Sequence, residues 1–313
     1  MIRTVELIAK RKIQKSIPQE RKDAYHVALV IEGGGMRGVA AGGMVSGLES
    51  LGLLNCFDSV HGSSAGAATG AYFVAGQARF GTSMFFEDLC GPEFINKKRI
   101  LFFGPIMDTS FLVDKVMQST KPLDFAALST SKIPLHIVGT DIDTGQPVTR
   151  THHDCYKAYR EMLKASIAIP FISGGPKTIE GKRVMDGGLI QQIALRSAID
   201  VGATHILVLQ TRREDEQIRP PANWKTKLQA LFLQLMYGGI IGRILLERSN
   251  TINAAVLDVR SGITSEVHCI DSISLDSSID YIHRLTKSPK PLKDAAIKME
   301  EKVNSVFSNL LGN

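Results

Sequence analysis

The residues of this 313-residue chain that could do chemistry lie in three short glycine-rich segments. Ser64 could act as a nucleophile, Asp186 as a proton acceptor, and the backbone of Gly33–Gly35 as a set of hydrogen-bond donors. These are the components of acyl transfer, in which N–H donors stabilise the oxyanion formed when a nucleophile attacks a carbonyl carbon. The three segments together indicate acyl-transfer chemistry.

Ser64 lies in the pattern G-x-S-x-G, which it forms with Gly62 and Gly66. The pattern stands between an expected strand and an expected helix, which is the setting of a nucleophile elbow. Small flanking residues permit the sharp turn that exposes the hydroxyl, and the next helix N-terminus favours negative charge on its oxygen. Ser63 is adjacent, but the spacing to both glycines selects Ser64 as the nucleophile.

The glycine-rich loop begins after an apolar run and comprises Gly33, Gly34, Gly35 and, three residues later, Gly38. Without Cβ atoms the backbone can adopt positive φ and turn its N–H groups toward one point. Such a cradle binds an anion, either a phosphate or the oxyanion of an acyl-transfer intermediate. The pattern also matches the dinucleotide fingerprint, but no acidic residue ends the second expected strand as that site requires. Nucleotide binding and a purely structural turn are the alternatives.

The base that activates the serine is either a carboxylate or a histidine. Asp186 ends a short expected strand, and Gly187 and Gly188 after it would allow a close approach to a serine. Partial desolvation would raise the pKa of this carboxyl and make it a better base. None of the eight histidines lies in a recognisable triad context, although His268 and His283 fall late enough for the order Ser–Asp–His. A histidine triad and an ordinary Asp-Gly turn therefore stay open as alternatives.

Two polar clusters could suggest a metal ion. Asp141 and Asp143 precede Gly145, but no glutamate closes a twelve-residue calcium loop. The side chains of the His-His-Asp run at 152–154 are adjacent in sequence and would point in different directions, which does not favour binding of one metal ion. We expect a turn at the first cluster, a polar loop or a helix cap at the second, and no metal or other cofactor.

The segments that position these residues alternate between strand and helix patterns. Strands are expected at 27–31, 57–61, 133–142, 182–185 and 205–209. Helices are expected at 39–51, 65–75, 154–166 and 194–201. This alternation predicts a three-layer α/β/α fold with a mostly parallel central sheet. Residues 79–124 are predicted to mix helix and loop as part of a substrate cleft.

Three parts are expected along the chain: a basic N-terminal extension over 1–25, a catalytic core over 26–212, and a mostly helical part over 213–313 packed on that core, with a strand near Val267. The N-terminal basic residues are expected to form a solvated helix face or to contact a membrane surface. These residues are Arg3, Lys10, Arg11, Lys12, Lys15, Arg21 and Lys22. No aromatic is interleaved with them, so nucleic acid is not an expected partner.

Composition and hydropathy narrow the class of protein. The chain is 44% hydrophobic, 22% charged and carries a net charge of +6, which is typical of a globular protein with anionic partners. Four widely spaced cysteines indicate reduced thiols and no disulfide framework or zinc site. No secretory signal is evident, and polar residues interrupt the apolar stretch 228–246, which we expect to be a buried helix more than an interfacial one. A cytoplasmic location with peripheral membrane contact is expected.

Taken together, the motifs resemble those of the patatin-like phospholipase family. The family's [D/E]-G-G-G-x-R-G loop, G-x-S-x-G elbow, A-S-x-A-x-P segment and D-G-[G/A] motif correspond, in that order, to residues 32–38, 62–66, 165–170 and 186–188. Glu32 stands where plant members have aspartate, and Ala194 where many members have proline. The resemblance covers residues 26–212. In its compact form the chain is similar to the bacterial single-domain members of the family.

The resemblance implies a lipid acyl hydrolase of the phospholipase A or lysophospholipase type. Ser64 would be the nucleophile and Asp186 its base, without a metal. The N–H groups of Gly33–Gly35 would form the oxyanion hole, within the loop that ends at Gly38, and Arg37 would brace this loop. The expected partner is a lipid or phospholipid at a membrane surface. A small-ester hydrolase or acyltransferase on the same core, and a non-enzymatic lipid-binding protein, are the alternatives.

Overall fold

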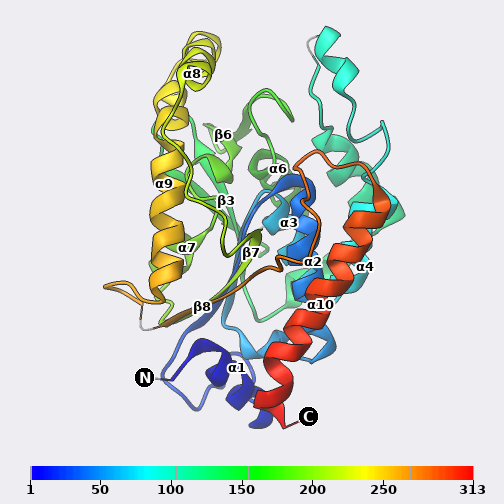
Figure 1. Ribbon diagram of the computed structural model, residues 1–313, viewed down its shortest axis with the longest axis vertical. Coiled ribbons are helices and arrows are strands. Elements are labelled where there is room, and N and C mark those ends of the chain that lie inside the picture. Colours follow the sequence, from blue (N-terminus) through cyan, green and yellow to red (C-terminus); the bar gives the residue numbers. More distant parts are fainter. Residues whose placement is uncertain (1, 103, 154, 268, 313) are drawn as a thin grey trace.

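The computed structural model describes residues 2–102, 104–153, 155–267 and 269–312. Asp154, from the polar cluster, and His268, from the histidine-triad alternative, lie outside the described residues. Within them the expected fold is confirmed: a mostly parallel sheet lies between two layers of helices (Figure 1).

The described residues form one eight-stranded sheet in the order β5-β6-β3-β2-β1-β7-β8, with β4 paired to β3 beside this path. The parallel strands are β1 (Val27–Ile31), β2 (Ser59–Ser63), β3 (Leu135–Asp141), β7 (His205–Arg213) and β8 (Cys269–Leu275). The antiparallel strands are β4 (Pro147–Thr151), β5 (Lys177–Ile179) and β6 (Lys182–Asp186). Strand β2 begins two residues later than the sequence pattern predicts, and this shift places the nucleophile motif directly at its end.

The central strand β1 explains the two helical layers. Every residue of its VALVI sequence is buried, as expected of a strand covered on both faces. Val27, Leu29 and Ile31 belong to one hydrophobic cluster, whereas Ala28 and Val30 belong to another on the opposite face. The first cluster packs under α2 (Gly38–Ser50), α3 (Ala65–Val74), α4 (Ala78–Glu87), α6 (Tyr156–Ser166) and α10 (Pro289–Leu311). The second packs under α7 (Leu195–Asp200) and α9 (Ile241–Ser261).

The C-terminal helix α10 packs closely against α2 because two glycines of α2 face it. A Cβ atom on Gly43 would lie 2.2 Å from the carbonyl oxygen of Ala296, and one on Gly47 would lie 2.8 Å from Cβ of Val303. Residues past 212 also supply β8 and α9, so this part of the chain extends the sheet and covers one of its faces.

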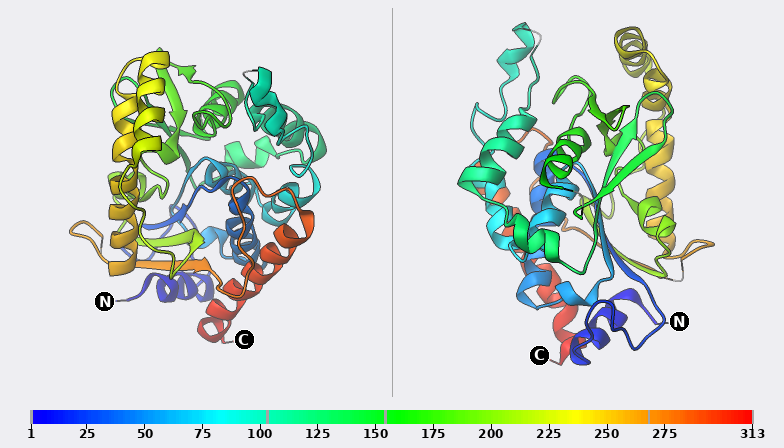
Figure 2. Two further views of the ribbon diagram at one scale, coloured as in Figure 1. Left: turned by 45° about the horizontal axis from the view of Figure 1, so that its top comes forward. Right: turned by 180° about the vertical axis from the view of Figure 1, so that it is seen from behind.

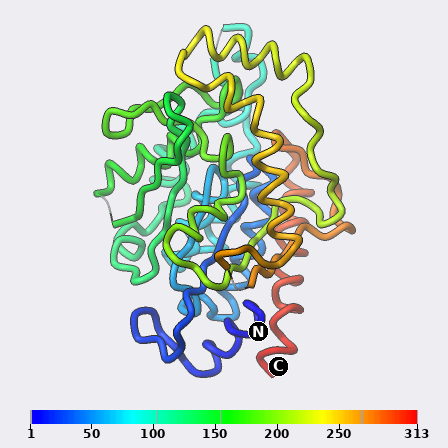
Figure 3. Tube along the Cα trace, turned by 90° about the vertical axis from the view of Figure 1, so that its left-hand side faces the viewer, coloured from blue at the N-terminus to red at the C-terminus, as the bar shows by residue number. Residues whose placement is uncertain are grey.

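The N-terminal segment is held by buried ion pairs. Arg11 on α1 (Thr4–Ile13) is completely buried and binds Asp23 at 2.7 Å and Asp58 at 2.7 Å, and Arg21 binds Asp58 at 2.6 Å. The expectation of a solvated face or a lipid contact is therefore wrong for Arg11. Both chain ends lie at the end of the molecule opposite α8 (Figure 3).

The apolar stretch 228–246 forms two helices rather than one. Gly238 and Gly239, both with positive φ, separate α8 (Trp224–Tyr237) from α9. The expectation of burial is wrong for much of α8, since Leu228 and Leu235 are 61% and 79% exposed. Among the described residues, no helix combines the length and the apolar run needed to cross a lipid bilayer.

Residues 79–124 form, besides part of α4, a short 3-10 helix η3 (Lys97–Phe102) and the π-helix η4 (Phe111–Thr120), followed by α5 (Phe125–Thr130). Helix η3 and helix α8 project from the same end of the molecule, on either side of it (Figures 1 and 2). The carboxyl ends of β1 and β2 point to this end as well, so both projections flank the loops that follow these strands.

Candidate active site

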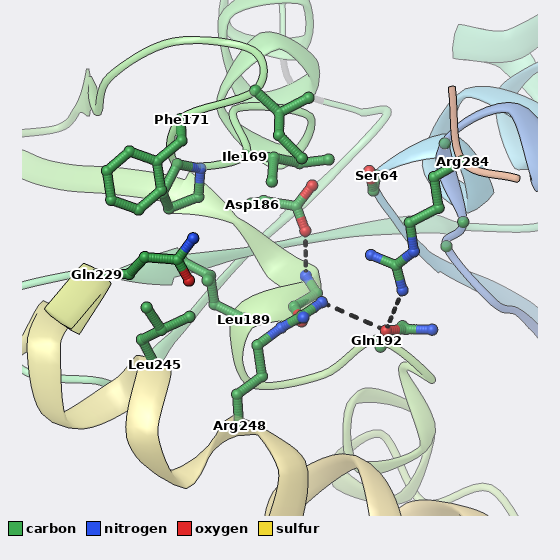
Figure 4. A pocket seen from close by; sticks show the side chains of 16 residues that line it. Ser64, Ile169, Phe171, Asp186, Leu189, Gln192, Gln229, Leu245, Arg248 and Arg284 are labelled. Atoms are coloured by element: carbon green, nitrogen blue, oxygen red, sulfur yellow. Dashed lines mark hydrogen bonds between the residues drawn. The ribbon is translucent and has the colours of Figure 1, made fainter. Parts of the chain in front are cut away.

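The three glycine-rich segments meet in one cavity of about 210 Å³ at the carboxyl ends of β1 and β2. Strand β1 leads into Gly33–Gly35, β2 leads into Ser64, and the antiparallel strand β6 ends at Asp186. All of these residues line the cavity (Figure 4). Loops at the carboxyl ends of parallel strands are the usual position for sites in α/β sheets.

Ser64 occupies a strained turn between β2 and α3. Its φ of 55° and ψ of −129° lie in a region that residues with a side chain rarely adopt. The two motif glycines allow this turn, because a Cβ atom on Gly62 would lie 2.6 Å from the backbone of Gly66, and one on Gly66 would lie 2.2 Å from the carbonyl oxygen of Ile31. The geometry is that of a nucleophile elbow.

Ser166 holds the elbow in place, a role that the sequence analysis did not assign. The backbone N–H of Ser64 donates to Ser166 Oγ at 3.0 Å, and Ser166 Oγ donates in turn to the carbonyl oxygen of Val138 at 2.6 Å. Both bonds are buried, so removing the hydroxyl would leave two backbone groups unpaired. Only the A-S-x-A-x-P segment of the sequence indicated that this residue matters.

One carboxylate oxygen of Asp186 accepts a hydrogen bond and the other does not. Its Oδ1 accepts a hydrogen bond from the Gly188 N–H at 2.5 Å, whereas the buried Oδ2 has no partner of normal geometry among the described residues. Burial raises the pKa of this carboxyl, and the Ser64 hydroxyl, Arg248 and the Gly188 N–H only partly oppose the rise. A desolvated carboxylate with a free oxygen beside a serine is suited to accept its proton.

The glycine loop offers two free N–H groups. The N–H of Gly33 donates to the carbonyl oxygen of Gln192 at 3.1 Å, but among the described residues the N–H groups of Gly34 and Gly35 have no hydrogen-bond partner. Of the three N–H groups expected to form an oxyanion hole, these two are therefore available as donors. Gly33 has a steric role instead, since a Cβ atom there would lie 2.7 Å from the carbonyl oxygen of Ser63.

The remaining motif residues shape the backbone around the cavity without lining it. Arg37 is buried, lies 3.7 Å from Glu216 and does not line the cavity, so its bracing action on the loop stays a prediction. A Cβ atom on Gly38 would lie 2.8 Å from Cβ of Ala65, and one on Gly187 would lie 2.2 Å from the carbonyl oxygen of Val138. Both glycines allow neighbouring segments to pack in direct contact.

Glu32 anchors the start of the glycine loop. This buried carboxylate binds Arg212 at 2.6 Å and accepts hydrogen bonds from Thr211 N–H and from Gln192 Nε2. Both Thr211 and Arg212 belong to β7, the strand next to β1. The acidic residue of the motif thus ties the loop to the neighbouring strand.

No described histidine lines the cavity with Ser64. His61 is buried, stacks on His136 and hydrogen-bonds to Ser59 and Ser197, and burial holds its pKa well below the usual range. His283 is exposed. Within the described residues, the carboxylate that lines the cavity together with Ser64 is that of Asp186, and its role as a base stays a prediction.

The polar clusters have structural partners. Asp141 accepts hydrogen bonds from the N–H of Asp143 and from Thr144, as in a tight turn, and His152 Nδ1 accepts one from the N–H of Leu135. Among the described residues, no group of three or more histidine, cysteine, aspartate or glutamate side chains has the arrangement of a metal site.

A second, apolar cavity opens from the same serine. It shares Gly35, Ser64 and Ile169 with the first cavity and measures only about 20 Å³. The rest of its lining is hydrophobic and comes mostly from α3, α4 and the segment up to η4: Met36, Ala65, Ala68, Met84, Phe85, Leu89, Phe94, Met107, Leu112 and Ile167. Residues between 84 and 112 thus line a cavity beside Ser64, whereas the predicted role of residues 79–124 in a substrate cleft stays a prediction.

Comparison with known proteins gives three findings. The model of the patatin-like phospholipase family matches residues 29–199. The uncharacterized protein YjjU of Escherichia coli strain K12 is 27% identical over 187 residues, which are 59% of this chain and 52% of YjjU, so the match spans about half of that relative. The crystal structure of VipD from Legionella pneumophila covers 93% of this chain and 73% of its own, with a TM-score of 0.38 and 12% sequence identity.

The raised pKa of Asp186 predicts that Asp186→Asn stabilises the protein at neutral pH. The carboxyl of Asp186 binds a proton more tightly in the folded protein than in the unfolded chain. The free energy of unfolding therefore falls as pH rises from the ordinary aspartate pKa of 3.8 to the raised value. The amide avoids this loss. Denaturant unfolding should therefore show a gain at neutral pH that disappears near pH 3.8.

Asp143→Asn is the matched control, since this exposed carboxyl pairs with Arg183 and has a lowered pKa. It should give no gain at neutral pH. If Asp186→Asn also gave none, burial would not dominate the environment of Asp186.

Proposed function

Because the chain belongs to the patatin-like phospholipase family, we propose that it hydrolyses carboxylic esters of lipids with Ser64 as the nucleophile and Asp186 as the base. The observation that carries the proposal is the meeting of a strained serine, a desolvated carboxylate with a free oxygen, and two unpaired N–H groups in one cavity.

The first half of the reaction forms an acyl-enzyme. Ser64 Oγ attacks the ester carbonyl carbon while its proton passes to Asp186 Oδ2. The carbonyl oxygen becomes an oxyanion, which accepts hydrogen bonds from the N–H groups of Gly34 and Gly35. When the tetrahedral intermediate collapses, the C–O bond to the alcohol breaks and Asp186 returns the proton to the leaving oxygen.

The second half releases the fatty acid. Water attacks the acyl-enzyme carbonyl and gives its proton to Asp186, and the same N–H groups stabilise the second oxyanion. Collapse breaks the bond to Ser64 Oγ, which takes the proton back. The raised pKa of Asp186 makes it a stronger base than an exposed aspartate. Activity should fall as pH drops through this pKa, because the protonated acid cannot accept the serine proton.

The apolar cavity is suited to the acyl chain of the substrate. Its lining is hydrophobic and begins at Ser64, so a chain that enters it leaves the ester carbonyl beside the nucleophile. Its small volume favours short acyl chains unless side chains such as Met84 and Leu112 move aside. A small-ester hydrolase on the same core is therefore the second candidate function.

We propose that the protein meets the lipid surface with α8 and η3. Leu231 and Leu235 on α8 and Leu101 and Phe102 on η3 are exposed, with Phe102 83% exposed. Gln229 and Leu245, from α8 and α9, line the cavity that contains Ser64, so the exposed apolar side chains of α8 lie on a helix that borders this cavity. Exposed apolar patches beside a binding cavity are typical of contact surfaces. The basic N-terminal helix lies at the opposite end (Figure 1).

The dyad predicts that Ser64→Ala and Asp186→Asn each lower fatty-acid release from phospholipid vesicles by about 1,000-fold or more. A calcium chelator should leave wild-type release unchanged. Ser63→Ala is the matched control, because Ser63 Oγ donates to the carbonyl oxygen of Gln191 and Ser63 does not line the cavity. Near-full release by Ser64→Ala would contradict the proposal.

The proposed membrane face predicts that Leu235→Glu weakens sedimentation with vesicles about tenfold, since each buried leucine side chain contributes about 1.5–3 kcal/mol. Hydrolysis of vesicle lipid should fall with binding, while hydrolysis of a water-soluble short-chain ester stays unchanged. Ile297→Glu, at an exposed isoleucine on α10, is the control. Equal effects of the two substitutions on vesicle binding would argue against this face.

A further inference from the structure

Three arginine side chains converge on one neutral oxygen in the wall of the catalytic cavity. The Nη2 atoms of Arg219, Arg248 and Arg284 lie 3.0, 3.3 and 3.0 Å from Gln192 Oε1. Figure 4 shows Arg248 and Arg284 reaching this oxygen from two different directions, near Asp186. Arg248 comes from α9 and the other two from segments before α8 and α10, so all three lie outside the residues that match the family model.

The positive charge of this cluster is only partly balanced, because Asp186 attracts Arg248 and Arg284 electrostatically without forming an ion pair with either. Within the described part of the chain, no carboxylate forms an ion pair with Arg219, Arg248 or Arg284, and the amide of Gln192 carries no charge. The nearby carboxylate Glu32 is already bound to Arg212. Burial and repulsion from the other arginines lower the pKa of Arg219 to about 9 and that of Arg284 to about 10. An anion placed among them would relieve both effects.

Two of the arginines have donors left for such an anion. Arg248 uses Nε on the carbonyl oxygen of Gly188 and Nη2 on Gln192, and Arg284 uses only Nη2. In the described residues, Arg248 Nη1 and Arg284 Nε and Nη1 make no hydrogen bond, and both side chains line the cavity. The planar fork of a guanidinium matches the oxygens of a phosphate group. Arg219 does not line the cavity, and its hydrogen bond to Gln192 Oε1 holds this amide in place.

We propose that Arg248 and Arg284 bind the phosphate group of a glycerophospholipid while Ser64 attacks one of its acyl esters. This inference rests on the hydrolase function proposed above and names its substrate class. In a glycerophospholipid the phosphate is a few bonds from the ester carbonyls, so one cavity that contains Ser64 and both arginines accommodates the two groups. Gln192 Oε1 fixes the orientation of the guanidinium groups before the substrate arrives.

The same arginines also lower the pKa of Asp186, which gives them a second conceivable role. If this were their whole contribution, their loss would slow the cleavage of every ester equally and would shift the pH profile. Phosphate binding instead predicts a loss confined to substrates that carry a phosphate, expressed mainly in KM. Two substrates that differ only in this group therefore separate the roles.

The test compares phosphatidic acid with the diacylglycerol of the same acyl chains, both in neutral detergent micelles. Arg248→Gln and Arg284→Gln should each lower kcat/KM for phosphatidic acid about 10- to 100-fold, which is the usual effect of losing a hydrogen bond to a charged group. For diacylglycerol, any loss that comes from the effect of these arginines on Asp186 should be about tenfold smaller than the loss for phosphatidic acid. Arg243→Gln, at an exposed arginine of the same helix that pairs with Glu247, should change neither value. Equal losses on both substrates would overturn the proposal.

A second experiment tests the phosphate site independently of hydrolysis. It measures by calorimetry how tightly the full-length Ser64→Ala protein binds two phosphate-bearing probes. Short-chain phosphatidic acid should bind, and Arg248→Gln or Arg284→Gln in this background should weaken it about tenfold or more. Inorganic phosphate tests the anion without the lipid. Phosphate binding by a protein that cleaves no lipid would leave the anion site standing and overturn the hydrolase. Lipid cleavage with no arginine-dependent binding of either probe would overturn the phosphate site alone.

Discussion

The candidate active site depends on backbone segments that approach one another more closely than a Cβ atom allows. The turn after β2 lies against the end of β1 because Gly66 leaves room for the carbonyl oxygen of Ile31. The loop after β6 reaches β3 because Gly187 leaves room for that of Val138. These contacts bring a serine from one strand and an aspartate from another into a single cavity. A side chain at either glycine would move the serine and the aspartate apart without changing the chemical groups of either residue.

Three features of the candidate site are unfavourable for the stability of the protein. Ser64 has a strained backbone, Asp186 is a buried carboxylate with an unpaired oxygen, and three arginines share one neutral acceptor. Each of these features is unfavourable in the free protein and would be relieved by a bound substrate or its transition state. The hydrophobic clusters on both faces of the sheet provide the stability that holds the strained groups in position.

The sequence predicted the features that depend on local patterns, namely the layered fold and the motif residues. It did not predict the contacts between segments that are distant in the chain. The buried run 27–31 and its alternation with helices predicted the layered fold, and the three glycine motifs predicted which residues share the cavity. No local pattern predicted that the N–H of Gly33 would donate to the carbonyl oxygen of Gln192. Nor did one predict that Arg248 and Arg284, which lie 60 and 96 residues beyond the last motif residue Gly188, would line the cavity. The exposure of α8 was also missed, because an apolar composition alone does not distinguish a buried face from a contact surface.

The most direct test of the central claim is covalent trapping of the nucleophile with a long-chain alkyl fluorophosphonate, followed by mass spectrometry of the peptides. The dyad predicts one label, on Ser64, with hydrolysis lost in proportion to labelling, and slower labelling in Asp186→Asn. A label on another residue, or full hydrolysis by protein that is completely labelled at Ser64, would contradict the account.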